Sequence, residues 1–216
     1  MKKYILPVIL FCVALSARSQ EYIGQKSFVG FSLGSLSYAG IYSKNTSILS
    51  HTSMSFAGFY SRKFILPQQL YVRGELMAGE IAGDNTNGVE STVPEIGSFR
   101  GYIAEASIKA EYEIISSYAS RIAPYIIAGG GAYYLFDYEP KQGEEKTIDE
   151  SWGFVLPAGA GIKYRVTDRI RLFAEGNYRF FPKNLDNYPG TVSNPNNYYS
   201  VSLGASFSLQ KFNRLW

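Results

Sequence analysis

The sequence predicts an all-β protein, an eight-stranded antiparallel up-and-down β-barrel that spans a membrane. Three observations lead to this prediction: segments that alternate apolar and polar residues, connections that alternate between long and short, and a high content of tyrosine, phenylalanine and glycine. Successive side chains of a strand point to opposite faces, so alternation gives each segment one apolar and one polar face. A barrel whose apolar faces point outward can lie in lipid.

The alternation is clearest in residues 169–180. Ile170 and Leu172 fall on one face there, and Arg171, Glu175 and Arg179 fall on the other. Seven further segments show the same pattern more weakly, and each of them is long enough for a tilted strand that crosses a bilayer. The predicted barrel has the size of OmpA and OmpX. The candidate strands are residues 27–41, 52–63, 69–81, 99–113, 123–136, 151–166, 169–180 and 197–210.

The connections between these strands alternate strictly in length. Long polar stretches follow the first, third, fifth and seventh strands, and shorter ones follow the second, fourth and sixth, the tightest at Thr167 and Asp168. This alternation places every long connection at one end, as in outer-membrane barrels with long external loops and short periplasmic turns. An odd-length turn or a bulge at Thr167 and Asp168 is also required to keep the polar residues on one face. We therefore expect a monomeric barrel located in the outer membrane, with membrane lipid as its surroundings.

Residues 1–19 are predicted to be a cleaved signal peptide, and residues 20–216 a single barrel domain. A lysine-rich start precedes a short apolar core, and small residues precede the predicted cleavage site near Gln20. The core is shorter than the ~20 residues that a helical span requires. Cys12 lacks the small preceding residue of a lipoprotein signal, so no lipid anchor is expected. The sequence thus predicts export.

Removal of the signal peptide changes the charge of the chain. The full sequence has 21 basic and 18 acidic residues, and three of the basic ones belong to the signal. The remaining chain is neutral, which argues against a nucleic-acid partner. It also contains no cysteine, and its only histidine is His51. We therefore predict no catalytic residue, no metal site and no cofactor.

Charged residues on the predicted inward face balance each other. An eight-stranded barrel has an interior just wide enough for side chains to fill. A buried charge without a partner is costly, so equal numbers of both signs predict a structural network of ion pairs across the lumen. A proton or ion relay is the alternative. The predicted network comprises Arg73, Glu75, Glu105, Lys109, Glu111, Lys163, Glu175 and Arg179.

Two further patterns have a chemical alternative. His51 and Ser53 have the spacing of the His-x-Ser pair of lipid A-modifying outer-membrane deacylases, but the sequence places no acid to orient the histidine. Residues 137–150 are acidic but lack the fixed ligand spacing of a calcium loop, so a solvated loop is favoured. Besides the enzyme, an adhesive or recognition barrel acting through its long loops and a periplasmic lipocalin-like binder remain alternatives.

Four segments resemble a known family. Residues 99–112, with Phe99, Arg100 and Glu105, and residues 124–129, 157–164 and 175–179 are similar to the small outer-membrane barrels of Bacteroidota, the PorG-like family of unknown-function domains that includes a barrel subunit of the type IX secretion system. The resemblance implies a non-enzymatic barrel of a Gram-negative bacterium with a structural or assembly role. It also implies secretion-system or periplasmic proteins as partners.

Overall fold

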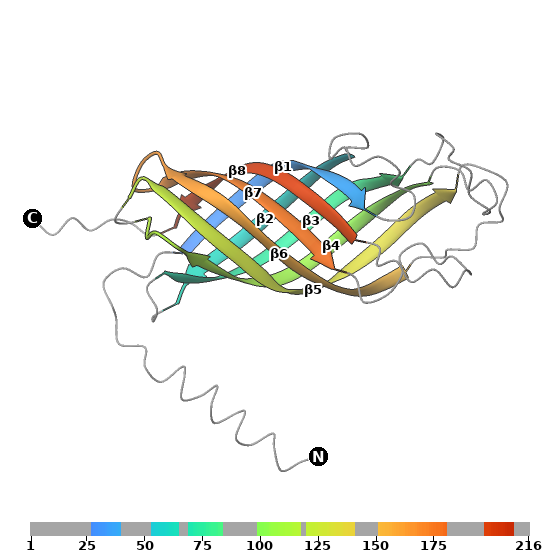
Figure 1. Ribbon diagram of the computed structural model, residues 1–216, viewed down its shortest axis with the longest axis horizontal. Helices are drawn as coiled ribbons and strands as arrows, with labels where there is room; N and C mark the ends of the chain where they lie inside the picture. Colours follow the sequence, from blue (N-terminus) through green and yellow to red (C-terminus); the bar gives the residue numbers. More distant parts are fainter. Residues whose placement is uncertain are drawn as a thin grey trace, which may run out of the picture.

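In the computed structural model, the described residues form a closed barrel of eight antiparallel strands (Figure 1), which confirms the predicted fold class. The structure describes residues 27–39, 53–64, 69–83, 99–117, 120–140, 151–180 and 197–209. None of these residues lies in a helix able to cross a bilayer. The predicted signal peptide lies outside them. The strands are β1 (Ser27–Ala39), β2 (Ser53–Lys63), β3 (Leu70–Gly83), β4 (Phe99–Glu113), β5 (Ile122–Pro140), β6 (Ser151–Arg165), β7 (Ile170–Phe180) and β8 (Asn197–Ser208).

Each strand pairs with its neighbours in the sequence, and β1 pairs with β8 to close the ring. The closing pair runs from Phe28 opposite Ser208 to Ala39 opposite Asn197, so it is as long as the strands themselves. Closure pairs the backbone N–H and C=O groups that would remain without hydrogen bonds at the two edges of an open sheet.

The strand boundaries agree with the predicted ones to within two residues except in β5, which runs to Pro140, beyond the predicted end at residue 136. The pairing of β4 with β5 shifts register between Arg100 and Tyr102, and beyond this irregularity Arg100 lies opposite Glu139. A bulge inserts an extra residue and interrupts the alternation of faces. The alternation pattern alone therefore ended the predicted strand too early.

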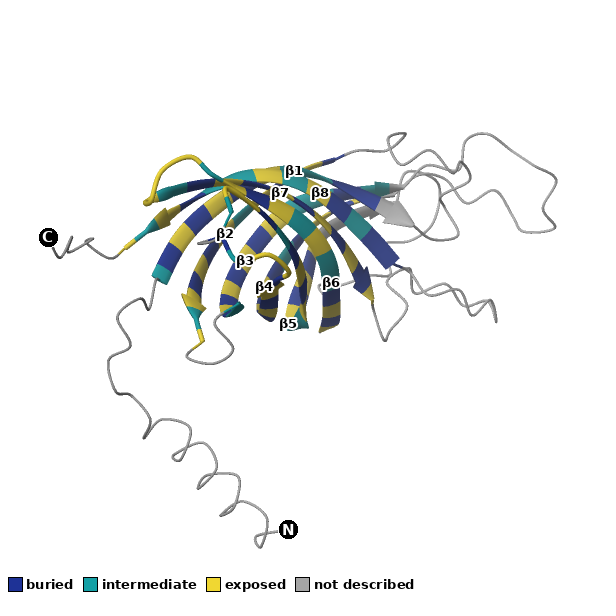
Figure 2. Ribbon diagram, turned by 60° about the vertical axis from the view of Figure 1, so that its left-hand side comes forward, coloured by how far each residue is buried: buried dark blue, intermediate teal, exposed yellow. Residues whose placement is uncertain are grey.

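Buried and exposed residues alternate along the strands (Figure 2). In β7, Arg171 and Glu175 are buried in the lumen, while Leu172 and Ala174 are exposed on the outer wall. The outer wall is apolar: Leu203 of β8, for example, is 66% exposed. The predicted alternation is confirmed, and the apolar parity points outward.

The two ends of the barrel differ. The connections β2–β3, β4–β5 and β6–β7 lie at one end, here named the turn end, and the longer connections lie at the other, the loop end (Figure 1). In the β6–β7 turn, the backbone N–H groups of Val166 and Thr167 both donate to the carbonyl oxygen of Ile170 at 3.1 Å. An odd-length segment separates Arg165 from its partner Arg171, which keeps both on the inward parity, as predicted.

Inward-facing glycines make room for aromatic rings inside the barrel. A Cβ at Gly161 would lie 2.5 Å from the Tyr125 ring and 2.6 Å from the carbonyl oxygen of Ala174. Gly204 lies in the same way beneath Phe173. The missing side chains allow large rings to lie flat on the wall, so the lumen is filled without widening the barrel.

We expect Gly161→Ala to lower the free energy of unfolding by about 1–3 kcal/mol, because the added methyl group overlaps both a ring and a backbone carbonyl. Gly176 is the matched control: it lies on the outer wall of β7 with nothing within 4 Å of an added Cβ. Urea unfolding of the reconstituted protein measures both variants. Equal stability of Gly161→Ala and Gly176→Ala would contradict the packing described.

Candidate functional site

The lumen contains all eight charged residues that the sequence analysis assigned to it. Each is buried, with at most 6% of its surface exposed, and they come from β3, β4, β6 and β7. Two residues join them, Glu113 and Arg171. Among the described residues, the buried charged side chains are thus five cations and five carboxylates: Arg73, Lys109, Lys163, Arg171 and Arg179 with Glu75, Glu105, Glu111, Glu113 and Glu175.

Arg73 is at the centre of the network. Its guanidinium group lies 2.7 Å from a carboxylate oxygen of Glu175, forms a second ion pair with Glu111, and lies 3.6 Å from Glu75. The Phe59 ring stacks under the guanidinium group, with its centroid 4.2 Å from Cζ. A planar group with several donors suits this position, because it pairs with carboxylates and stacks on a ring at the same time.

Neutral side chains complete the coordination of the central carboxylates. Tyr125 donates its hydroxyl to Glu175 at 2.5 Å, and the amide nitrogen of Asn177 donates to the other oxygen of Glu175 at 2.7 Å. Lys109 Nζ lies 2.6 Å from Glu75. Every central carboxylate therefore has a cation beside it, which offsets the cost of removing it from water.

The network continues toward the turn end. Lys163 pairs with Glu111 and lies 3.2 Å from Glu113, and Arg171 lies 3.4 Å from the same oxygen of Glu113. The other oxygen of Glu113 accepts a hydrogen bond from the backbone N–H of Ser117 at 2.9 Å. Glu113 thus ties the lumen network to the β4–β5 connection.

A separate pair lies nearer the loop end. Arg179 Nε lies 2.6 Å from Glu105, and the hydroxyl of Tyr198 donates to the same carboxylate oxygen at 2.9 Å. Arg179 also donates to the Ser200 hydroxyl at 2.7 Å. These contacts join β4, β7 and β8 across the lumen.

A layer of apolar side chains closes the lumen beyond this pair. They project inward from the loop-end halves of β1, β3, β4, β5, β6 and β8 and pack into one cluster. The ion pairs lie in the middle and toward the turn end. Both parts also contain other buried residues, such as Phe28 and Tyr71 toward the turn end and Ser37 and Asn197 at the loop end. The cluster comprises Leu36, Met77, Ile81, Ile103, Tyr133, Leu135, Val155 and Tyr198.

The described residues offer little catalytic chemistry. No group of three or more metal-ligating side chains occurs among them. Ser53 is buried at the loop end of β2, and its predicted partner His51 lies outside the described residues. Most of the acidic stretch 137–150 also lies outside them. The arrangement inside the lumen is therefore suited to filling and fixing the barrel.

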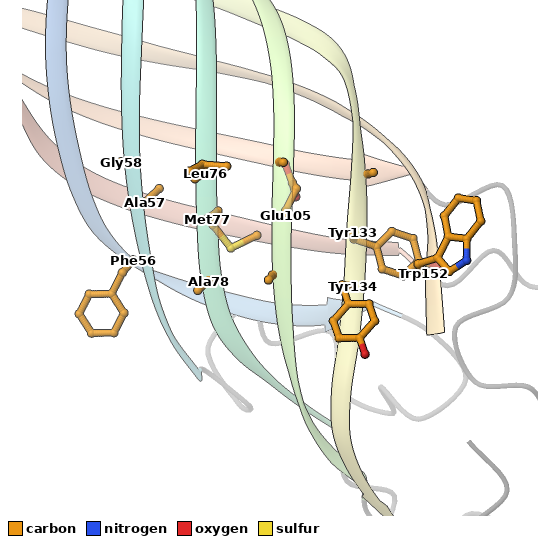
Figure 3. A pocket seen from close by; sticks show the side chains of 13 residues that line it. Phe56, Ala57, Gly58, Leu76, Met77, Ala78, Glu105, Tyr133, Tyr134 and Trp152 are labelled. Carbon is orange, nitrogen blue, oxygen red and sulfur yellow. The ribbon is translucent and has the colours of Figure 1, made fainter. Parts of the chain in front are cut away.

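The outer wall carries one described depression, of about 630 Å³, across β2 to β6 (Figure 3). Phe56 lies at one side and Tyr134 and Trp152 at the other, and small residues such as Gly58 and Ala78 form its floor. Its surface is mostly apolar, which suits contact with hydrocarbon.

The predicted network omitted Glu113 and Arg171, although the alternation had already placed Arg171 on the polar face of its strand. Both have the inward parity of their strands: Glu113 is two residues from Glu111, and Arg171 is four residues from Glu175. Glu113 is the last residue of β4 and Arg171 the second residue of β7, so a parity count over the full strands includes both. The sequence also indicated the apolar cluster, because Met77 and Ile103 are apolar residues at inward positions near the loop end of their strands.

Comparisons with known proteins give the fold. No family model and no curated protein matches the chain. Among solved structures, Neisserial surface protein A matches with a TM-score of 0.51 and 15% identity, over 84% of this chain and 96% of that one. The attachment invasion locus protein of Yersinia pestis, with a bound heparin analogue, matches with a TM-score of 0.48 and 13% identity, over 86% of this chain and 99% of that one. A major outer membrane protein of Thermus thermophilus matches with a TM-score of 0.47 and 15% identity, over 86% of this chain and 99% of that one.

We expect Arg73→Met to lower the free energy of unfolding by about 3–5 kcal/mol, because it leaves buried carboxylates without their main cation. Arg100→Met is the matched control, because Arg100 pairs with Glu80 at 2.5 Å but is 53% exposed. An exposed pair contributes only about 0–1 kcal/mol. Denaturant unfolding in detergent measures both. A loss in Arg73→Met no larger than in Arg100→Met would refute the central role of Arg73.

Proposed function

We propose that this protein is an integral outer-membrane β-barrel without enzymatic activity that acts as a monomeric structural component. The observation that carries the proposal is the apolar outer wall. Large side chains such as Leu76, Ile108, Phe154 and Leu203 are each at least 65% exposed on it. A water-soluble protein rarely exposes so continuous an apolar surface, whereas lipid is the natural solvent for it.

The predicted signal peptide, residues 1–19, supports export of the barrel domain, residues 20–216. The lumen supports a structural role: ion pairs occupy its middle and an apolar layer covers its loop end. A filled interior makes a rigid anchor and offers little path for a solute.

A role in protein secretion is the finer proposal. The segments that resemble the PorG-like barrels of Bacteroidota support assembly with a type IX secretion machine. In such a role the barrel anchors periplasmic or secretion-system proteins at the membrane. Its partners then bind at the ends of the barrel, since the wall contacts lipid.

Recognition through the loops is the second candidate. The long connections all leave the barrel at the loop end, which is the arrangement that a barrel exposing loops to the exterior requires. The lipid A-modifying alternative has less support, because Ser53 is buried and so poorly placed to meet a lipid substrate.

Labelling with a probe confined to the bilayer tests the membrane location. On a Cys12→Ser background, we expect Leu172→Cys and Leu203→Cys to react, because both side chains are exposed on the outer wall. Ser206→Cys is the matched control, since Ser206 faces the lumen of β8. Mass spectrometry measures the labelled fraction. Protection of both leucine positions would contradict the membrane location and favour the lipocalin-like binder.

Affinity purification tests the secretion role. We expect the tagged chain, cross-linked in membranes of a Bacteroidota host, to co-purify with secretion-system proteins identified by mass spectrometry. A tagged barrel of the same membrane without a secretion role is the control. Recovery of an inserted barrel with the same proteins as the control would reject the secretion role and favour recognition through the loops.

A further inference from the structure

The connections at the turn end share one pattern of side chains. Each combines an outward tyrosine on the strand that leads into it, an exposed apolar residue and an exposed arginine. These groups differ in sequence and spacing, so the pattern is a feature of the surface and not of a repeat. The sets are Tyr60, Arg62 and Phe64 at β2–β3, Tyr112, Ile115 and Arg121 at β4–β5, and Tyr164, Val166 and Arg169 at β6–β7.

These sets lie around part of the circumference: two strands separate β2–β3 from β4–β5 and β4–β5 from β6–β7, whereas four strands separate β6–β7 from β2–β3 through the closing pair β1–β8. Their backbones are fixed by the barrel. The carbonyl oxygen of Arg121 accepts from the N–H of Arg165 at 2.8 Å, that of Arg169 accepts from Ser208 at 2.8 Å, and Arg62 pairs with Val72 inside the sheet. The arginines therefore form an arc around the turn end, here named the basic collar and defined as Arg62, Arg121 and Arg169.

The charge of the molecule is sorted by end. The lumen is balanced, and the described charged residues at the turn end that are not buried are Arg62, Lys63, Arg121, Arg165 and Arg169 against Asp168 alone. The sequence of the loop-end connections, residues 40–52, 84–98, 141–150 and 181–196, contains eight acidic and four basic residues. The described residues at the turn end are thus mainly basic, and the sequence of the loop-end connections is mainly acidic.

We propose that the basic collar binds the phosphate groups of anionic phospholipids in the leaflet at the turn end. Guanidinium groups pair with phosphate through parallel hydrogen bonds. The outward tyrosines lie on the strands, nearer the middle of the barrel than the turn residues Phe64, Ile115 and Val166. The tyrosines therefore suit the boundary of the hydrocarbon, and the turn residues lie at the headgroup level beside the arginines.

A soluble anion explains these observations less well. It needs the cations alone, whereas each arginine of the collar lies in a set with an outward tyrosine and an exposed apolar side chain. Only a lipid brings a phosphate and a hydrocarbon chain to the same place. The proposal rests on the proposed membrane location, and it adds a lipid class and a leaflet to it.

Nanodiscs provide the test. The full chain, purified from membranes, is reconstituted in phosphatidylcholine with a minor fraction of phosphatidylglycerol, and native mass spectrometry measures which lipids stay bound. We expect phosphatidylglycerol to be enriched several-fold on the protein, and the triple variant Arg62→Gln, Arg121→Gln, Arg169→Gln to reduce the enrichment to about one. Arg100→Gln is the matched control at the loop end and should keep the enrichment.

Three results would overturn the proposal, each for a different reason. Failure of the wild-type chain to enter nanodiscs of any composition would reject the proposed membrane location itself. Entry with unchanged enrichment in the triple variant would reject the collar alone. Loss of enrichment on addition of millimolar inorganic phosphate, at constant ionic strength, would identify a site for free phosphate.

Two further measurements keep the test decisive. If the triple variant does not fold, Arg121→Gln replaces it, because Arg121 lies outside the strands and should give a partial loss of enrichment. Raising the salt concentration should also weaken the wild-type enrichment, since the screening length falls from about 10 Å at 0.1 M to about 3 Å at 1 M. An enrichment that is unchanged by both the Arg121→Gln substitution and the higher salt concentration would contradict the proposal.

Discussion

Closure of the hydrogen-bonded ring is the constraint on which the rest of this structure depends. The pairing of β1 with β8 removes the free edges, so the barrel needs no partner to satisfy its backbone. Closure also divides every strand into one face toward a narrow lumen and one face away from it. Side chains on the inward face must fill a space of fixed width, and those on the outward face must match the surrounding solvent.

The lumen meets this requirement with a network of ion pairs packed among aromatic rings and with an apolar cluster nearer the loop end. Arg73 contacts carboxylates on three strands and the Phe59 ring on a fourth, so one side chain connects much of the wall. The arrangement is stable only as a set, because each member is costly without its partners. This explains why the buried charges balance among the described residues and why glycines such as Gly161 make room for the rings between them.

The sequence predicted the strands and their inward faces, but it did not predict the contacts between side chains. Alternation identified every strand and assigned Arg73, Glu175 and the other six predicted charges to the inward parity. It did not identify which carboxylate each cation contacts, because partners such as Arg73 and Glu175 are about a hundred residues apart and meet only through the register of several strands. The β5 extension also went unseen, since a bulge interrupts alternation without a change in composition.

The sequence by itself determined the faces, because side-chain direction in a strand depends only on parity. It likewise determined the balance of charge and the ends at which long and short connections lie. Only the tertiary structure decided which inward side chains contact one another in the lumen and how the arginines of the turn end are arranged around the barrel. The physical reason is that stagger between paired strands sets the height of each residue along the barrel, and stagger depends on contacts around the whole closed ring.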